Sequence, residues 1–434
     1  MVPTPLRVAI DAQIYPLETF GGVATTLTGL VRSLGTLDGP EEYVIIGPSQ
    51  EPDWLRPFLG PNQRMVSGPV PPRRGLTSVV GRLRSVSSRL RARAARPVDG
   101  AEKYRAPVSD GFYERLGCEV IHFPDVEFVV SRLPAIYNPH DLQHLHFPEF
   151  FTPKALMWRA AYHPTGCRLA HTVVVESRWV KDDIVKQFGL DPKKIQVIPL
   201  APPTQTYPEP SVAAAGHVLN TYGLEQPFAL YPALTWPHKN HVRLLEALAL
   251  LRDRHQIRVR LVCTGYQNSF WPQVERRLGD LGLQDQVRFL GMIPAEHLRA
   301  VYRLTQFVVI PTLFEAASEP VYEAWHDGAP VACSNVTSLP AQAGDAALIF
   351  DPHSVESIAA AVGEMATNAQ LREVLTQRGA ARLRNFSWDR TAKAYRAVYR
   401  RAAGRPLTEE ERWLLTWDWM QDTKEEQSPA RRAG

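Results

Sequence analysis

The sequence predicts an α/β protein built from two Rossmann-like domains whose parallel sheets face each other across a cleft. Two observations predict this fold. Short apolar runs alternate with helical patterns in both halves of the chain, and a proline-rich stretch without such a pattern separates the halves at residues 199–210. The chain has 434 residues, enough for two or three domains. We therefore expect one domain at 1–205 and a second at 206–385.

The first half begins with a strand and a helix. Apolar residues recur at helical spacing from Val23 to Leu34, directly after Gly21 and Gly22. Alternating strands and helices indicate a parallel, doubly wound sheet. The strands expected in this half are residues 8–10, 43–47, 120–123, 135–137 and 171–175.

The second half repeats the alternation and ends in a further helix. This helix is expected to begin after Ser387, its N-cap, and to run to about Arg401. Neither half contains a G-x-G-x-x-G segment, which argues against a dinucleotide dehydrogenase. Residues 405–434 form a tail to which the sequence assigns no role. The strands expected in this half are residues 228–231, 259–263, 287–290, 307–310 and 331–335, and its helices include 241–251 and 295–304.

The composition is that of a globular protein, with 44% hydrophobic and 22% charged residues. The four cysteines lack metal-type spacing, so we expect buried thiols in a reducing compartment. No apolar run approaches membrane-spanning length. The first strand begins at about Arg7, which predicts that no secretory signal precedes it and that the protein is cytoplasmic.

Residues 71–98 contain eight arginines and no acidic residue, whereas the whole chain has a net charge of +4. The rest of the chain is therefore net negative. This distribution favours one anionic partner surface and argues against general nucleic-acid binding. Within 71–100, Val79, Leu83, Val86 and Leu90 follow a helical spacing. A basic amphipathic helix would hold the protein peripherally on the inner face of an anionic membrane. A flexible insertion is the alternative.

Two glutamates flank the start of a predicted helix in the second half. Glu315 follows the buried strand at 307–310, and Glu323 lies early in a helix with Ser318 as N-cap and Pro320 in its first turn. A helix N-terminus suits a phosphate, and carboxylates accept hydrogen bonds from sugar hydroxyls. The pattern predicts a nucleotide-sugar site, although two glutamates at this spacing also occur by chance on solvated helices.

This E-x7-E element and the segments after it resemble the family 4 retaining nucleotide-sugar glycosyltransferases, which have the GT-B fold. The resemblance covers roughly residues 6–400. It implies that 1–205 is the acceptor side, that 206–385 binds the nucleotide-sugar donor, and that 386–404 crosses back to the first domain. The segments that carry it after Glu323 are residues 327–335, 338–340, 343–347 and 350–352.

The resemblance also implies roles for single residues. Lys239, in the segment Pro-His-Lys-Asn-His, would neutralise the donor diphosphate. Glu315 would bind the sugar hydroxyls, Glu323 the nucleotide ribose, and the helix start at Ser318 the diphosphate. His140 would touch the donor sugar or the acceptor.

On the other side of the expected cleft, the backbone of Gly21 and Gly22 would approach the same diphosphate. A plain turn is the alternative for these glycines. His144, His146 and His163 make a metal site conceivable, but the second pair of ligands is missing. The chain contains no D-x-D, so we expect neither a metal nor a cofactor.

The sequence departs from the family pattern in two places. Ala233 stands where many relatives have an arginine, so either His238 compensates or the phosphate is held with less charge. Ala-Ala-Ser at 316–318, followed by Glu319, replaces the usual Gly-Phe-Gly, and we expect Glu319 to point away from the site. If it does not, donor binding is weaker or the donor is unusual. Two alternatives remain open: a nucleotide-sugar epimerase on a related scaffold, and a non-catalytic protein that binds a nucleotide-sugar or organises a biosynthetic complex.

Overall fold

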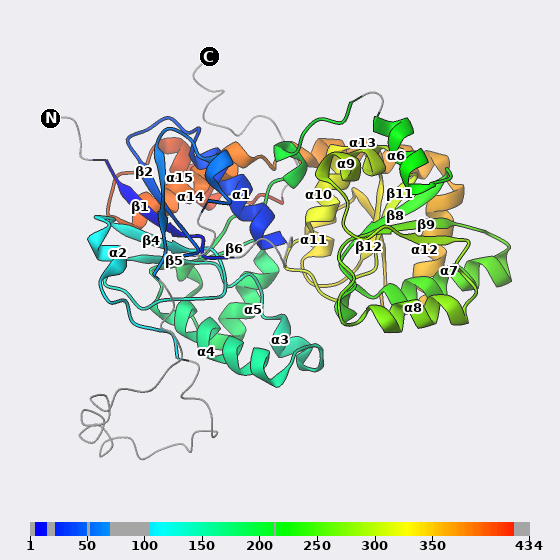
Figure 1. Cartoon of the computed structure of the whole chain (residues 1–434), viewed down its shortest axis with the longest axis horizontal. Helices are drawn as coiled ribbons and strands as arrows, with labels where there is room; N and C mark the ends of the chain where they lie inside the picture. The colour runs from blue at the N-terminus through cyan, green and yellow to red at the C-terminus, as the bar shows by residue number, and fades with distance from the viewer. Residues whose placement is uncertain (1–4, 15–21, 50–52, 70–104, 212–213, 421–434) are drawn as a thin grey trace.

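The computed structural model describes residues 5–14, 22–49, 53–69, 105–211 and 214–420, and it contains two parallel sheets side by side (Figure 1). The N-terminal sheet has the strand order β3-β2-β1-β4-β5-β6-β7. Every pair in it is parallel, as the alternation of strands and helices predicts. Its strands are β1 Arg7–Asp11, β2 Glu42–Gly47, β3 Gln63–Ser67, β4 Val120–Phe123, β5 Ala135–Tyr137, β6 Thr172–Val175 and β7 Ile195–Val197.

The C-terminal sheet has the order β10-β9-β8-β11-β12-β13, and its pairs are also parallel. In both sheets the central strands are buried on both faces, which explains their continuous apolar runs. The strands are β8 Phe228–Pro232, β9 Arg260–Thr264, β10 Val287–Phe289, β11 Phe307–Ile310, β12 Val331–Ser334 and β13 Ala347–Phe350.

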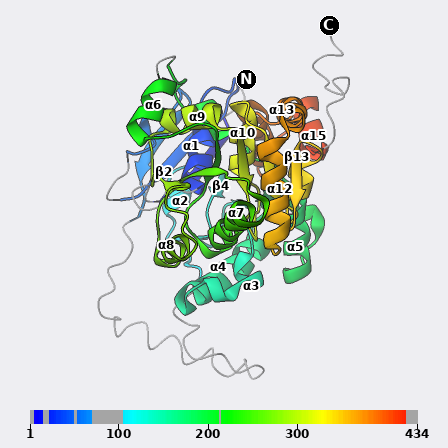
Figure 2. The same cartoon turned by 90° about the vertical axis from the view of Figure 1, so that its right-hand side faces the viewer.

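Helices cover both sheets, and α7 and α12 pack against each other on the C-terminal half (Figure 2). The helices of the N-terminal half are α1 Gly22–Leu34, α2 Phe112–Arg115, α3 Gln143–His146, α4 Pro153–Leu169 and α5 Arg178–Phe188. Those of the C-terminal half are α6 Ala214–Tyr222, α7 His241–His255, α8 Trp271–Asp280, α9 Ala295–Leu304, α10 Glu319–His326, α11 Leu339–Ala343, α12 Val355–Thr367 and α13 Ala369–Leu383.

Helix α14 (Trp388–Ala402) returns to the N-terminal half, as expected, and it is followed there by α15 (Glu409–Thr416), which was not expected (Figure 1). The side chain of Ser387 caps α14, accepting from the backbone N–H of Arg390. Helix α14 packs on α1, and the indole of Trp388 donates to the carbonyl of Pro202 at 3.0 Å. Residues 405–420 dock on the body of the protein, since α15 packs on α14 and the carbonyls of Leu415 and Trp419 accept hydrogen bonds from Gln196 and Asn385.

The strands expected in each half are confirmed, whereas β3, β7 and β13 were not anticipated. All four cysteines are buried and unpaired, as predicted, and the compartment remains a prediction. Gly21 and the arginine segment 71–100 lie outside the described residues, so the membrane-binding helix stays a prediction. Among the helices that the structure describes, none combines the length and the apolar character needed to cross a bilayer.

Candidate active site

Lys239 is held rigidly in the connection between β8 and α7. It ends a 3₁₀ turn at Pro237–Lys239, and its carbonyl accepts a hydrogen bond from the Tyr231 hydroxyl of β8 at 2.6 Å. The next residue, Asn240, has a left-handed backbone (φ 62°), which asparagine tolerates better than most residues. Its side-chain amide donates to the carbonyls of Pro311 and Pro352, both at 2.9 Å. These bonds fix Lys239 beside the end of β11.

Glu315 lies on the loop after β11 and pairs with Lys239. The Lys239 Nζ donates to Glu315 Oε1 at 2.6 Å, and both side chains are mostly buried. The Thr337 hydroxyl, 3.0 Å from the Glu315 nitrogen and 2.7 Å from its carbonyl oxygen, bonds to the backbone of Glu315. The Ser338 hydroxyl donates to the same carbonyl. Two of the predicted site residues are therefore in direct contact.

Ser318 is the N-cap residue of α10, as predicted, and the side chain of Gln342 makes two hydrogen bonds to the Ser318 backbone. Gln342 Oε1 accepts from the Ser318 N–H and Gln342 Nε2 donates to the Ser318 carbonyl, each at 2.8 Å. The side chain of Ser318 makes no capping bond within the helix. Among the described residues its hydroxyl is buried and has no hydrogen-bond partner. A rigid helix start with a buried, unbonded hydroxyl suits an anionic ligand.

Glu323 lies one turn into α10 and is 6% exposed. The Tyr302 hydroxyl of α9 donates to Glu323 Oε2 at 2.7 Å. Burial raises the pKa of Glu323 to about 7, an effect that the Tyr302 hydrogen bond opposes. The second oxygen of this carboxyl is the one left for a ligand hydroxyl.

Glu319 does not point away from the site, so that expectation was wrong. Its Oε1 accepts from the Thr26 hydroxyl of α1 at 3.0 Å, and its Oε2 lies 3.1 Å from the position that a Cβ on Gly22 would take. The carboxyl therefore lies against the first turns of α1. Burial and the neighbouring Glu323 raise the pKa of Glu319 to about 8.

The connection between β8 and α7 holds little positive charge besides that of Lys239. Ala233, the residue directly after β8, is buried and contributes no charge. Burial and the nearby charge of Lys239 hold the pKa of His238 well below its usual range, so this imidazole is neutral at pH 7. The low pKa of His238 favours the second alternative, in which the phosphate is held with less charge.

His140 lies at the carboxyl edge of the N-terminal sheet, after β5, with a left-handed backbone (φ 60°). Its Nδ1 lies 2.9 Å from Glu176 Oε1 and its Nε2 lies 3.0 Å from the Pro124 carbonyl. Burial lowers the pKa of His140, but the hydrogen bond and charge of Glu176 outweigh it and raise the pKa to about 9. The imidazolium is thus bound to Glu176 and Pro124, and its contact with a sugar stays a prediction.

The loop that carries Glu315 also contacts the N-terminal half through Phe314. This ring is 2% exposed, and its centroid lies 5.5 Å from that of His146 and 5.4 Å from that of Trp179. His146 is in turn 2.8 Å from the Asp183 carboxylate. Figure 1 shows α10 and α11 on the side of the C-terminal half that faces the N-terminal half. The donor-side residues therefore lie where the two domains meet.

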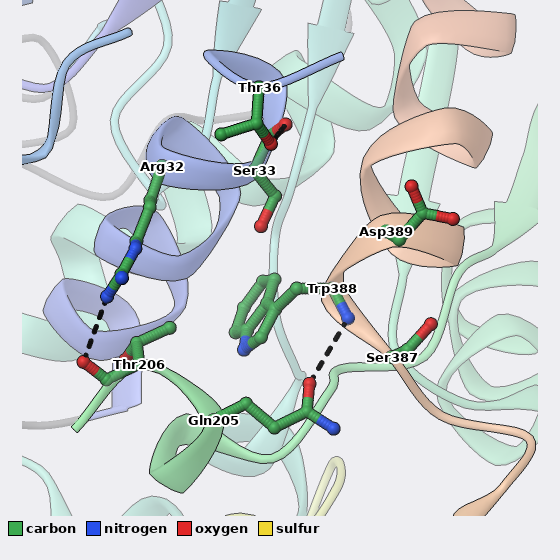
Figure 3. Close-up of a pocket in the computed structure, with 8 residues that line it drawn as sticks. All are labelled: Arg32, Ser33, Thr36, Gln205, Thr206, Ser387, Trp388 and Asp389. Atoms are coloured by element: carbon green, nitrogen blue, oxygen red, sulfur yellow. Dashed lines mark hydrogen bonds between the residues drawn. The ribbon is translucent and has the colours of Figure 1, made fainter. Parts of the chain in front are cut away.

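A separate pocket of about 280 Å³ lies at the junction of α1, the interdomain linker and α14 (Figure 3). It is lined by Arg32 and Ser33 of α1, Gln205 of the linker and Trp388 of α14, among others. These α1 residues are about ten positions beyond Gly22, some 15 Å along the helix. The pocket therefore lies where the linker meets α1 and α14, and it is separate from the residues around Lys239.

Five of the predicted site residues lie around α10: Lys239, Glu315, Ser318, Glu323 and Gly22. Within the described residues, no group of histidine, cysteine and carboxylate side chains could hold a metal ion. The sequence reasoning missed the residues that position this group. Thr337 and Gln342 belong to the loop and helix after β12, and no local spacing links them to Glu315. Tyr302 was missed because a buried tyrosine on a helix has no distinguishing pattern.

Comparison with known proteins identifies this arrangement. Residues 20–205 match the model "Glycosyltransferase Family 4", and residues 221–382 match "Glycosyl transferases group 1". The O-antigen chain mannosyltransferase B of Escherichia coli is 31% identical over 61% of this chain and 70% of that protein. The MMP alpha-(1->4)-mannosyltransferase of Mycolicibacterium hassiacum is 26% identical, and the match spans about half of each chain.

Solved structures agree on the fold. Sucrose-phosphate synthase from Thermosynechococcus elongatus superimposes with a TM-score of 0.66 at 16% identity, over 91% of this chain and 98% of that one. The Anabaena protein HepE, solved with UDP and glucose, gives 0.65 at 14% identity, over 91% and 99%. The two matching models together span most of the chain, and the architecture agrees with them. The chain therefore belongs to glycosyltransferase family 4 and has the GT-B fold.

Proposed function

We propose that this protein is a retaining glycosyltransferase that moves a sugar from a nucleoside diphosphate sugar to an acceptor hydroxyl. The observation that carries the proposal is the Lys239–Glu315 ion pair, 2.6 Å long, beside the start of α10. A cation and a carboxylate at a helix N-terminus match the two halves of such a donor, since one half is anionic and the other is rich in hydroxyls.

Donor binding would exchange the partners of this ion pair. The diphosphate takes the Lys239 ammonium, together with the N–H groups at the start of α10 and the buried Ser318 hydroxyl. Glu315 is then free to accept hydrogen bonds from the sugar hydroxyls. The free oxygen of Glu323 accepts from a ribose hydroxyl, while Tyr302 holds the other oxygen.

In the transfer step the bond from the anomeric carbon to the diphosphate breaks, and the acceptor oxygen attacks the same face. Because the acceptor oxygen attacks directly, no protein nucleophile is required, and because the acceptor proton passes to the leaving diphosphate, no protein base is required. Lys239 and the α10 N-terminus stabilise the charge that develops on the leaving group, the largest type of contribution in many enzymes. The step needs no metal ion in this proposal.

The acceptor is proposed to be a glycan or a lipid-linked glycan of a cell-surface polysaccharide or glycolipid, met in the cytoplasm or at its membrane. The support is the relationship to the O-antigen chain mannosyltransferase B of Escherichia coli. That relative and the Mycolicibacterium one are named as mannosyltransferases, so a mannose donor is the first to test.

The test begins with a thermal-shift screen against GDP-mannose, UDP-glucose and dTDP-glucose, because a ligand that binds only the folded state raises Tm. The best donor is then incubated with candidate glycan acceptors. We expect release of nucleoside diphosphate, a product that retains the anomeric configuration by NMR, and full activity in EDTA. An inverted product, or loss in EDTA that a divalent ion restores, contradicts the mechanism.

The same assay separates the alternatives. An epimerase changes the sugar of the donor without releasing nucleoside diphosphate. A non-catalytic protein binds the nucleotide-sugar and leaves it intact with every acceptor. The intact Lys239–Glu315 pair favours the transferase.

A further inference from the structure

The carboxyl of Glu319 occupies the space between the two helix starts that meet at the proposed donor site. Glu319 belongs to the first turn of α10. Its Oε1 accepts a hydrogen bond from the Thr26 hydroxyl of α1, and its Oε2 lies 3.1 Å from the position that a Cβ on Gly22 would take. Thr26 and Glu319 are 293 residues apart in sequence, so this contact joins the two domains. A diphosphate placed at the start of α10 would lie beside this carboxyl.

The charged groups around Glu319 are mostly acidic, and Lys239 is the cation among those that act on it. Glu323 faces it from the same helix, Glu315 and Lys239 act on it from the loops after β11 and β8, and Tyr207 of the linker lies near it. Lys239 is paired with Glu315 in this structure and, in the proposed donor complex, with the diphosphate. Since His238 is neutral, an ionised Glu319 would repel a diphosphate that carries about two negative charges at close range.

We infer that Glu319 carries a proton whenever a nucleoside diphosphate sugar is bound, so that donor binding takes up one proton at alkaline pH. This inference rests on the proposed function and adds a role for a residue of this chain. As an uncharged acid, the Glu319 carboxyl keeps α1 docked on α10 through Thr26 and adds no charge to the phosphate site. Burial already raises the pKa of Glu319 to about 8, in line with this role.

The test is calorimetric titration of the wild type with the nucleotide-sugar chosen by the thermal-shift screen, between pH 6 and 9.5. A nucleotide-sugar is the right probe because its diphosphate lacks the terminal phosphate ionisation near pH 6 that a free nucleoside diphosphate has. We expect about tenfold weaker binding for each pH unit above about 8, where Glu323, whose pKa is about 7, is already ionised. Titrations at pH 9 in buffers of different ionisation enthalpy should show about one proton taken up.

Two variants assign the proton to Glu319. Glu319→Gln is neutral at every pH and still accepts from Thr26, so its Kd should stay constant above pH 8. In Thr26→Val the hydrogen bond that favours the ionised carboxylate is lost, so the break in the wild-type curve should move to higher pH. Glu356→Gln, an exposed glutamate in the first turn of α12, is the matched control and should follow the wild type.

A wild-type Kd that changes less than twofold from pH 7 to 9.5, or protons released on binding, would overturn the inference, since Glu319 would then bind the donor ionised or leave the site. The same pH dependence in Glu319→Gln would assign the proton to another group and overturn it equally. Failure of every nucleotide-sugar to bind at pH 6–7 would instead contradict the proposed function. Thermal melts at each pH confirm that each protein is folded.

Discussion

Lys239 is the residue whose charge the proposed reaction uses most directly. Its ammonium lies 2.6 Å from Glu315 and is held by a backbone anchored to Tyr231 and Asn240. We expect Lys239→Ala to lower turnover by two to three orders of magnitude, roughly the effect of removing one group that stabilises developing negative charge. Steady-state kinetics checks this, with the exposed Lys193→Ala as control. A loss of less than a few-fold would make Lys239 an ordinary loop residue.

His140 gives the fold a pH dependence that can be measured without substrate. Its pKa is raised to about 9 beside Glu176, so the imidazolium stabilises the folded state. This contribution is complete below the unfolded pKa of about 6.5 and is lost as the pH rises through 9. The free energy of unfolding should therefore fall over that window.

The matched variant is His140→Asn, because asparagine accepts the left-handed backbone at this position. We expect the stability gap between wild type and variant to shrink by up to about 3 kcal/mol between pH 6.5 and 9. Urea denaturation at several pH values measures the gap, with the exposed His255→Asn as control. A gap that does not change with pH would show that His140 is not charged in the folded state.

The positions of Glu315, Ser318 and Glu323 could be predicted from the buried strand and the helix start that follows it, and the carboxyl ends of parallel strands share one edge of a sheet. Lys239 was proposed from the resemblance to the family. The direction of Glu319 could not, because Thr26 and Gly22 hold it from the other domain. Nor could the hydrogen bonds between Gln342 and the Ser318 backbone, since they join the last turn of α11 to the start of α10. Local spacing therefore suggests candidate ligands but does not reveal the residues that position them.

At the scale of elements, the packing of α14 on α1 attaches the C-terminal segment to the N-terminal half. Gly29 of α1 faces the indole of Trp388, and a Cβ there would overlap the ring. We expect Gly29→Ala to lower the free energy of unfolding by about 1–3 kcal/mol, the usual cost of overpacking. Gly216→Ala in α6 has open space around it and should be neutral or stabilising, by up to about 1 kcal/mol.

Chemical denaturation of both variants measures this pair. Equal stabilities for Gly29→Ala and Gly216→Ala would mean that α14 does not pack on α1 as described.

Helix α14 also illustrates what the sequence predicts at the scale of elements. The N-cap and end of α14 follow from Ser387 and its helical spacing. The start of α15 also has a local pattern, the capping box of Thr408 and Glu411, which the sequence analysis missed. The strands β3, β7 and β13 are short and depend on their neighbours for burial.

For the whole molecule, the C-terminal segment ties the domains together. Gln196 of β7 donates to the Leu415 carbonyl, and Asn385, after α13, donates to the Trp419 carbonyl. Glu411 of α15 is fully buried and accepts from Arg396 and Arg400, both at 2.9 Å. Loss of this carboxylate would leave two mostly buried arginines without that partner.

We expect Glu411→Ala to destabilise the protein by about 3–5 kcal/mol, as for breaking a buried ion pair by removal of one partner. Denaturant unfolding of the full chain provides the measurement, and Glu409→Ala, exposed in the same first turn, is the control. If Glu411→Ala unfolds like the wild type, α15 contributes no stability to the assembled domains.

The central claim is that the two glutamates of the E-x7-E element divide donor binding from transfer, and calorimetric titration of the chosen nucleotide-sugar together with turnover tests it most directly. We expect Glu323→Ala, folded by circular dichroism, to show no donor binding, and Glu315→Gln to bind the nucleoside diphosphate but lose turnover. Glu323→Gln still accepts from Tyr302 and separates loss of charge from loss of packing. Wild-type donor affinity in folded Glu323→Ala, or wild-type turnover in Glu315→Gln, would contradict the account.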